Sequence, residues 1–186
     1  MTTPARPTPR HAARLAVAGL FGVLVNAVVL LLAPLLRPEI SLLDGGLSEY
    51  GIGPWAALQN VGFFALGAGS LAIAAALSLA PIPSPWLPLG TALLALAAAA
   101  SASLAAFPMD APGPATFLGD THQTAGTLSV GLQLAALLAT ALAFRSAAAG
   151  RRHAARGLRL FSAANAGALL PQAELLWEAL PIPLGV

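Results

Sequence analysis

The residues best suited to acid–base chemistry gather in one short stretch, FPMDAPGPATFLGDTH, at positions 107–122. It contains Asp110, Asp120 and His122, which are two of the chain's seven acids and one of its three histidines. A carboxylate within hydrogen-bond reach of an imidazole can act with it as acid and base. Asp110 and His122 are therefore candidate catalytic residues.

The sequence gives less support to metal binding, haem binding and nucleophilic catalysis. His122, Asp110 and one glutamate would suffice in number for a zinc site, but no closely spaced histidine pair accompanies them. His11 and His153 lie in arginine-rich segments, so a haem held by two histidines is excluded. The chain has no cysteine, no Gly-x-Ser-x-Gly turn and no nucleotide-binding glycine loop. We therefore predict no metal, no cofactor and no nucleic-acid partner.

The composition decides what surrounds these residues. Hydrophobic residues make up 58% of the 186 and charged residues only 9%, and the mean hydropathy is +0.80. A water-soluble domain carries roughly 25% charged residues, because its surface must be solvated. We therefore predict an all-α, polytopic transmembrane helix bundle that forms a single domain at 15–180.

A bilayer core about 30 Å thick needs about 20 apolar residues in a helix. Four runs meet this length, and the first is too long for the core of a signal peptide. The fifth is uncharged only from Leu160 to Ala173, so it spans only by continuing to Leu180. A fifth segment that stops at Pro171 and re-enters is the alternative. The five predicted helices are 15–36, 55–80, 86–107, 121–144 and 158–180.

The charges predict the orientation of these helices. Arginines precede the first helix and surround the loop after the fourth, and these two segments hold eight of the nine arginines. All seven acids fall in the loops and the chain end on the other side. Because positive residues stay in the cytoplasm, we expect a basic cytoplasmic tail at 1–14 and a short extracytoplasmic tail at 181–186.

With these predicted helices and this orientation, Glu174 lies inside the last turns of the fifth helix. An ionisable group at membrane depth is by default a functional candidate, so Glu174 joins Asp110 and His122 as a candidate catalytic residue. Arg37 is the one arginine on the acidic side. It either extends its guanidinium to the interface or pairs with Glu174 or Asp110.

The first outer loop, RPEISLLDGGLSEYGIGP at 37–54, is too apolar for a flexible linker. We expect it to fold back as a re-entrant or interfacial segment, with Tyr50 and Trp55 at the level of the lipid head groups.

A polar stripe runs inward along the fourth helix. Asp120 is a plausible N-cap of this helix. His122, Gly126, Ser129 and Gln133 follow at spacings of four, three and four, so they share one face. This face should point into the bundle, where the stripe either joins helices by hydrogen bonds or lines an outward-opening cavity. Available partners on other helices are Asn26, Gln59, Asn60, Asn165 and Gln172. The predicted ligand-binding residues are Asn60, Asp110, His122, Gln133, Glu174 and Arg37.

Three segments together resemble a known family. They are PEISLLDGGLSEYGIGPWAALQNVGFFALGAGSLAIAAAL at 38–77, FPMD at 107–110 and THQTAG at 121–126. The chain is similar over about 12–165 to the bacterial and archaeal membrane proteins catalogued as domain of unknown function 998. The resemblance implies a plasma-membrane location and six helices in typical relatives, and it names no activity. The motif positions it implies are Ser48, Tyr50, Gly67, Gly69, Phe107, Pro108, Asp110 and His122.

Two functions remain open. The first is a non-enzymatic subunit or accessory protein, or one that binds a lipid-like ligand at a polar extracytoplasmic face. Its expected partners are membrane lipids, another membrane protein or a second copy of the chain. The alternative is a membrane-embedded hydrolase or transferase that acts on a lipid through His122 and Asp110. The residues leave enzyme activity undecided and favour the first hypothesis.

Overall fold

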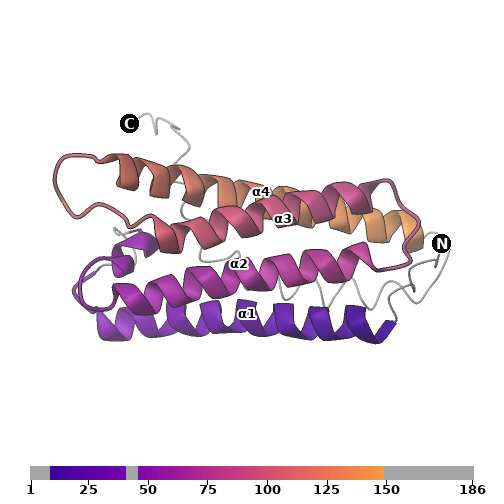
Figure 1. Cartoon of the computed structure of the whole chain (residues 1–186), viewed down its shortest axis with the longest axis horizontal. Helices are drawn as coiled ribbons and strands as arrows, with labels where there is room; N and C mark the ends of the chain where they lie inside the picture. Colours follow the sequence, from indigo (N-terminus) through magenta and orange to yellow (C-terminus); the bar gives the residue numbers. More distant parts are fainter. Residues whose placement is uncertain (1–8, 41–45, 149–186) are drawn as a thin grey trace, which may run out of the picture.

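The computed structural model describes residues 9–40 and 46–148, which form helices and no strand. The elements are α1 (Pro9–Leu36), η1 (Leu47–Gly51), α2 (Ala56–Ser78), α3 (Trp86–Ala106) and α4 (Phe117–Ala148) (Figure 1). The four α-helices are long and apolar enough to cross a membrane. The predicted fifth helix at 158–180 and the tail at 181–186 lie outside the described residues.

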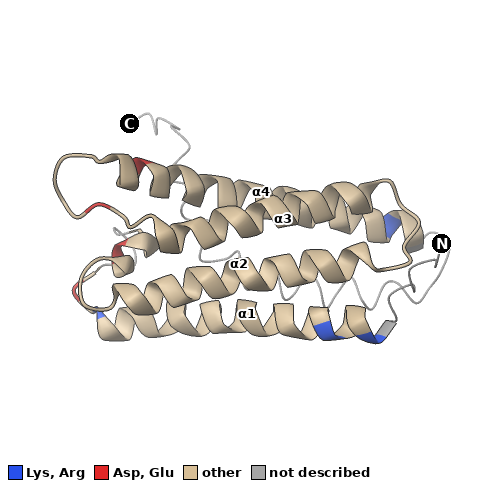
Figure 2. Ribbon diagram, viewed as in Figure 1, with Lys and Arg blue, Asp and Glu red and all other residues tan. Residues whose placement is uncertain are grey.

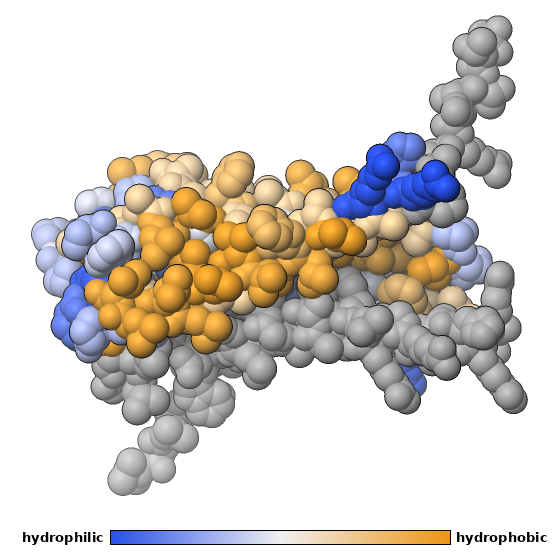
Figure 3. Space-filling view, turned by 90° about the horizontal axis from the view of Figure 1, so that it is seen from below, coloured by the Kyte–Doolittle hydropathy of each residue, from blue (hydrophilic) through white to orange (hydrophobic). Residues whose placement is uncertain are grey.

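The helices pack in chain order. α1 lies against α2, α2 against α3, and α3 against α4, while η1 packs on the ends of α2 and α1 (Figure 1). Side chains on the outer face of α1, such as Leu31, Leu35 and Val17, are more than two-thirds exposed. Figure 3 shows apolar residues in a broad region between polar ends on the visible face. Such a surface is suited to hydrocarbon and not to water.

Glycines bring α1 and α2 into backbone contact. A Cβ atom on Gly22 would lie 2.5 Å from the carbonyl oxygen of Ala65. A Cβ on Gly69 would lie 2.7 Å from the carbonyl oxygen of Gly19. Without a hydrophobic driving force between helices in lipid, this close approach supplies van der Waals contact that larger side chains would prevent. The glycines of α1 and α2 therefore form the contact between these two helices.

Glycines also allow close packing of α2 on α3 and of α3 on α4. A Cβ on Gly67 would lie 2.8 Å from the carbonyl oxygen of Ala98, where α2 meets α3. A Cβ on Gly90 would lie 2.6 Å from Thr140 Oγ1, where α3 meets α4. Thr140 is fully buried, and its hydroxyl donates to the carbonyl oxygen of Ala136 at 2.7 Å. Small residues thus align all three packed pairs.

The two ends of the bundle carry opposite charges. In the described residues, Arg10 and Arg14 lie near the start of α1 and Arg145 lies in the last turn of α4. The acidic side chains lie at the other end (Figure 2). We call the acidic end the outer end, following the predicted orientation.

The first outer loop contains the short helix η1. Tyr50 is 2% exposed and its hydroxyl donates to the carbonyl oxygen of Ile40 at 3.3 Å. Trp55 is 45% exposed. The described part of the loop therefore packs on the bundle, with Tyr50 buried and Trp55 partly exposed.

Candidate functional site

His122 lies in the second turn of α4 and is 3% exposed. Its Nδ1 is 2.6 Å from the carbonyl oxygen of Phe107, the residue that ends α3. Because a carbonyl only accepts hydrogen bonds, Nδ1 carries the proton of this bond. The ring of Phe63 meets the imidazole edge-on, with centroids 5.9 Å apart. His122 therefore joins α4 to the end of α3 and to α2.

Asp110 fixes the start of α4. Its carboxylate accepts hydrogen bonds from the amide of Thr116 at 2.7 Å and from the hydroxyl of Thr116 at 2.6 Å. The hydroxyl oxygen of Thr116 in turn accepts from the amide of Gly119 at 3.2 Å. The Asp110 carboxylate lies so close to Gly119 that a side chain at that position would collide with it. The hydrogen bonds from the Thr116 hydroxyl and amide lower the pKa of Asp110.

This arrangement corrects the predicted start of the fourth helix. α4 begins at Phe117 and not at 121, so Asp120 lies in its first turn. The amide of Asp120 is already bonded to the carbonyl oxygen of Thr116 at 2.9 Å. Thr116, supported by Asp110, holds the capping position predicted for Asp120.

We expect Asp110→Ala to loosen the first turn of α4, because both bonds that hold Thr116 are lost. Amides 117–121 should exchange with deuterium several times faster in this variant at neutral pH. Since the folded pKa of Asp110 is lowered, its contribution is present at neutral pH and disappears as the pH falls through that lowered pKa. Asp120→Ala is the matched control and should change exchange much less. Equal protection of 117–121 in the wild type and in Asp110→Ala would rule out this role.

The acid–base pair required by the enzyme hypothesis does not form among the described residues. No ion pair within 4 Å joins His122 to a described carboxylate, and the ion pair between described residues joins Arg37 and Glu39. Nδ1 of His122 is engaged by a backbone carbonyl and Asp110 by Thr116. Glu174 lies outside the described residues.

Arg37 bonds to residues of its own loop. Its Nε donates to the Glu39 carboxylate and its Nη1 donates to the carbonyl oxygen of Ile52. Gly53, at φ +88°, lies beneath the guanidinium, where a Cβ would be 3.5 Å from Nη1. These contacts hold the two ends of the first outer loop together. Arg37 thus pairs with Glu39 and not with Asp110, while Glu174, the other candidate partner, lies outside the described residues.

The polar stripe of α4 faces the bundle interior, as its spacing predicts. Ser129 and Gln133 are 2% and 6% exposed. The Gln133 amide donates to the hydroxyl oxygens of Ser129 at 3.0 Å and Ser101 at 3.2 Å, and these hydroxyls are 2.7 Å apart. Ser101 is a partner that was not predicted from the sequence. A single serine within the alanine-rich run of α3 could have indicated it. The lower part of the stripe therefore joins α3 and α4.

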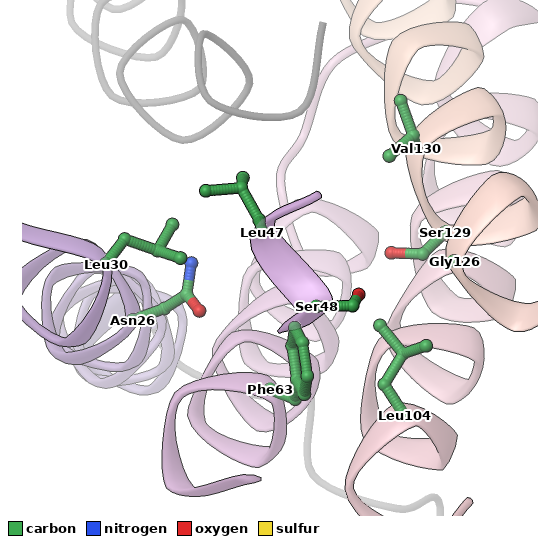
Figure 4. Close-up of a pocket in the computed structure, with 9 residues that line it drawn as sticks. All are labelled: Asn26, Leu30, Leu47, Ser48, Phe63, Leu104, Gly126, Ser129 and Val130. Atoms are coloured by element: carbon green, nitrogen blue, oxygen red, sulfur yellow. The ribbon is translucent and has the colours of Figure 1, made fainter. Parts of the chain in front are cut away.

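The upper part of the stripe borders a cavity of about 30 Å³ near the outer end. Asn26 is 2% exposed and lines this cavity from α1. Figure 4 shows the Asn26 amide and the Ser129 hydroxyl pointing into this space from opposite sides, with Ser48 of η1 between them. The cavity is lined by Asn26, Leu30, Leu47, Ser48, Phe63, Leu104, Gly126, Ser129 and Val130.

The cavity differs from the predicted ligand site. Of the six predicted ligand-binding residues, none lines it, although Gln133 and His122 lie one turn from lining residues on α4. Asn60 is half-buried on α2, outside the lining. Among the described lining residues, the polar groups are one amide and two hydroxyls, and none is charged. Burying a charge there would be costly, so the cavity is suited to a neutral hydroxyl or carbonyl group.

Comparison with protein families finds a match over residues 20–184 to the family described as "Protein of unknown function (DUF998)". Comparisons with curated proteins and with solved structures find no match. The match covers most of the chain and includes α2, α3, α4 and the part of α1 from residue 20 onward. The chain therefore belongs to the DUF998 family of proteins of unknown function.

Proposed function

We propose that this plasma-membrane protein binds an uncharged, hydroxyl- or carbonyl-bearing amphiphile at its outer end, in the cavity between Asn26, Ser48 and Ser129. The proposed orientation places its amino terminus in the cytoplasm. One observation carries the proposal: Asn26, a polar residue that is only 2% exposed, lines the cavity together with the hydroxyls of Ser48 and Ser129.

The Asn26 amide specifies the chemistry of the ligand. A hydrogen bond inside a protein contributes about 0.5–1.5 kcal/mol, so a ligand group that bonds to Asn26 gains affinity from this contact. An amide offers both donors and an acceptor, and the two hydroxyls add further sites of both kinds. A ligand hydroxyl, which also donates and accepts, matches this set.

The size of the cavity limits how the ligand is held. A volume of about 30 Å³ accommodates a polar head of one or two heavy atoms and not an alkyl chain. The chain of the amphiphile would therefore remain in the lipid, while apolar side chains such as Phe63 and Leu104 shield the bound head from water. His122 bonds to a backbone carbonyl through Nδ1, and Asp110 bonds to Thr116. His122 Nε2 is buried without a partner, but His122 does not line the cavity, so the proposal is one of binding without catalysis.

The proposal is tested by photolabelling the full chain in nanodiscs with a long-chain alcohol that carries a diazirine. We expect unlabelled alcohol, and not the alkane of equal length, to compete with labelling. Asn26→Leu should reduce labelling about tenfold, the effect of losing one buried hydrogen bond. Asn60→Leu, the same change at a position outside the cavity, should stay within twofold of the wild type.

Two results would overturn the proposal. One is labelling of Asn26→Leu at the wild-type level. The other is equal competition by the alcohol and the alkane, which would show that the ligand's polar head does not contribute to binding.

A further inference from the structure

A second hollow lies on the outside of the bundle, away from the cavity at Asn26. It is an open groove of about 420 Å³ between the last turns of α3 and the first three turns of α4. The polar part of its lining comprises Ser103, Asp120, Thr121 and Thr124, and the apolar part includes Ala100, Ala125 and Leu128.

The groove runs from the outer end of the bundle toward its middle. Asp120 and Leu128 are eight residues apart on α4, which corresponds to about 12 Å along the helix axis. Asp120 lies in the first helical turn, and Leu128 is 51% exposed on the lipid-facing surface. The head-group region on each side of a bilayer is only about 5–8 Å thick, so a groove of about 12 Å can extend from the head groups into the acyl chains.

The polar rim of the groove presents acceptors only. The hydroxyl of Ser103 donates to the carbonyl oxygen of Ala100 at 2.7 Å, and that of Thr121 to the carbonyl oxygen of Phe117 at 2.7 Å. The hydroxyl of Thr124 donates to the carbonyl oxygen of Asp120 at 2.9 Å. Each hydroxyl hydrogen is thus engaged within its own helix, and the oxygens remain able to accept.

Asp120 supplies the charge of this rim. Its side chain is exposed, and its carboxylate receives no hydrogen bond from the described residues, unlike the carboxylate of Asp110. It is the only charged residue in the described lining of the groove. A negative charge among hydroxyl acceptors is complementary to a cation that carries several N–H donors.

We propose that this groove binds an outer-leaflet phospholipid whose head group ends in a primary ammonium, with the ammonium on Asp120 and an acyl chain along Ala125 and Leu128. A quaternary ammonium has no N–H to give to these acceptors. It is recognised instead by several aromatic faces, and Phe117 is the single aromatic residue in the described lining. The groove should therefore distinguish ethanolamine from choline head groups.

The test is native mass spectrometry of the full chain with equimolar ethanolamine and choline phospholipids that have identical acyl chains. We expect the wild type to retain about five times more of the ethanolamine lipid, the upper range for an exposed ion pair. Asp120→Asn should reduce this ratio to about one. Glu39→Gln removes an equivalent charge from the same end of the bundle outside the groove, and it should keep the wild-type ratio.

A series of lipids with zero to three methyl groups on the ammonium provides a test that needs no variant. Retention by the wild type should fall at each methylation as N–H donors are removed, even if Asp120→Asn does not fold. Equal retention across the series, or a preference that persists in a folded Asp120→Asn protein, would overturn the proposal. Asn26→Leu should leave the preference for the ethanolamine lipid unchanged. The groove proposal and the cavity proposal can therefore be tested independently.

Discussion

Leucine at position 69 should lower the midpoint of thermal unfolding by roughly 10 °C, the largest loss of stability that we expect from a single substitution. Gly69 of α2 packs directly on the backbone of α1, and a Cβ there would lie 2.7 Å from the carbonyl oxygen of Gly19. A backbone carbonyl cannot rotate away as a side chain can, so the two helices must separate along their contact. Overpacking of this kind costs about 3 kcal/mol, and each kcal/mol corresponds to about 2–4 °C in a chain of this size.

Gly131→Leu is the matched control. Gly131 lies on the exposed face of α4, and nothing lies within 4 Å of its Cβ position. Leucine is also a better helix former than glycine, so this variant should unfold within about 2 °C of the wild type. The measurement is thermal unfolding in detergent, followed by loss of helical circular dichroism. If both variants unfold at the wild-type temperature, α1 and α2 do not pack through Gly69.

An all-or-none effect is expected when single cysteines are labelled to determine orientation. The chain contains no cysteine, so each introduced thiol is the only one. Ala111 is exposed in the loop between α3 and α4, and Pro83 is exposed in the loop between α2 and α3, at the opposite end of the bundle. Because arginines cluster at the end that includes Pro83, we expect this end to face the cytoplasm.

A membrane-impermeant maleimide should therefore label Ala111→Cys in intact cells and should label Pro83→Cys only after the membrane is opened. Labelling of Pro83→Cys before permeabilisation, with Ala111→Cys protected, would reverse the proposed orientation. It would also place the cavity and the groove on the cytoplasmic side. Labelling of both after permeabilisation controls for the reactivity of each thiol.

Hydropathy predicts the membrane-spanning parts of the described helices well. The second and third were predicted at 55–80 and 86–107, and they are found at Ala56–Ser78 and Trp86–Ala106. Hydropathy identifies the segment that prefers lipid, and a helix can continue beyond it into polar surroundings. For this reason α1 begins at Pro9, within the predicted basic tail, and α4 begins at Phe117 and not at 121.

The candidate site could be predicted only in part. A spacing of three and four places His122, Ser129 and Gln133 on one buried face, because that relation lies within one helix. Which residues meet this face depends on how neighbouring helices are aligned along their axes. Single-helix periodicity carries no information about this alignment, so Ser101 was missed and Asn26 was one of several possible partners. Asp110 and His122 are close in sequence, but Thr116 and Phe107 are closer partners in space.

The most direct test of the proposed function is an experimental structure of the full chain in a bilayer that contains a long-chain alcohol. We expect density for the alcohol's hydroxyl within about 3 Å of the Asn26 amide, with Ser48 and Ser129 beside it and the alkyl chain leading into the lipid. A cavity that holds only water, or one closed by a rotated Asn26 bonded to another side chain, would contradict it. Either of those results would make Asn26 a structural residue of the bundle.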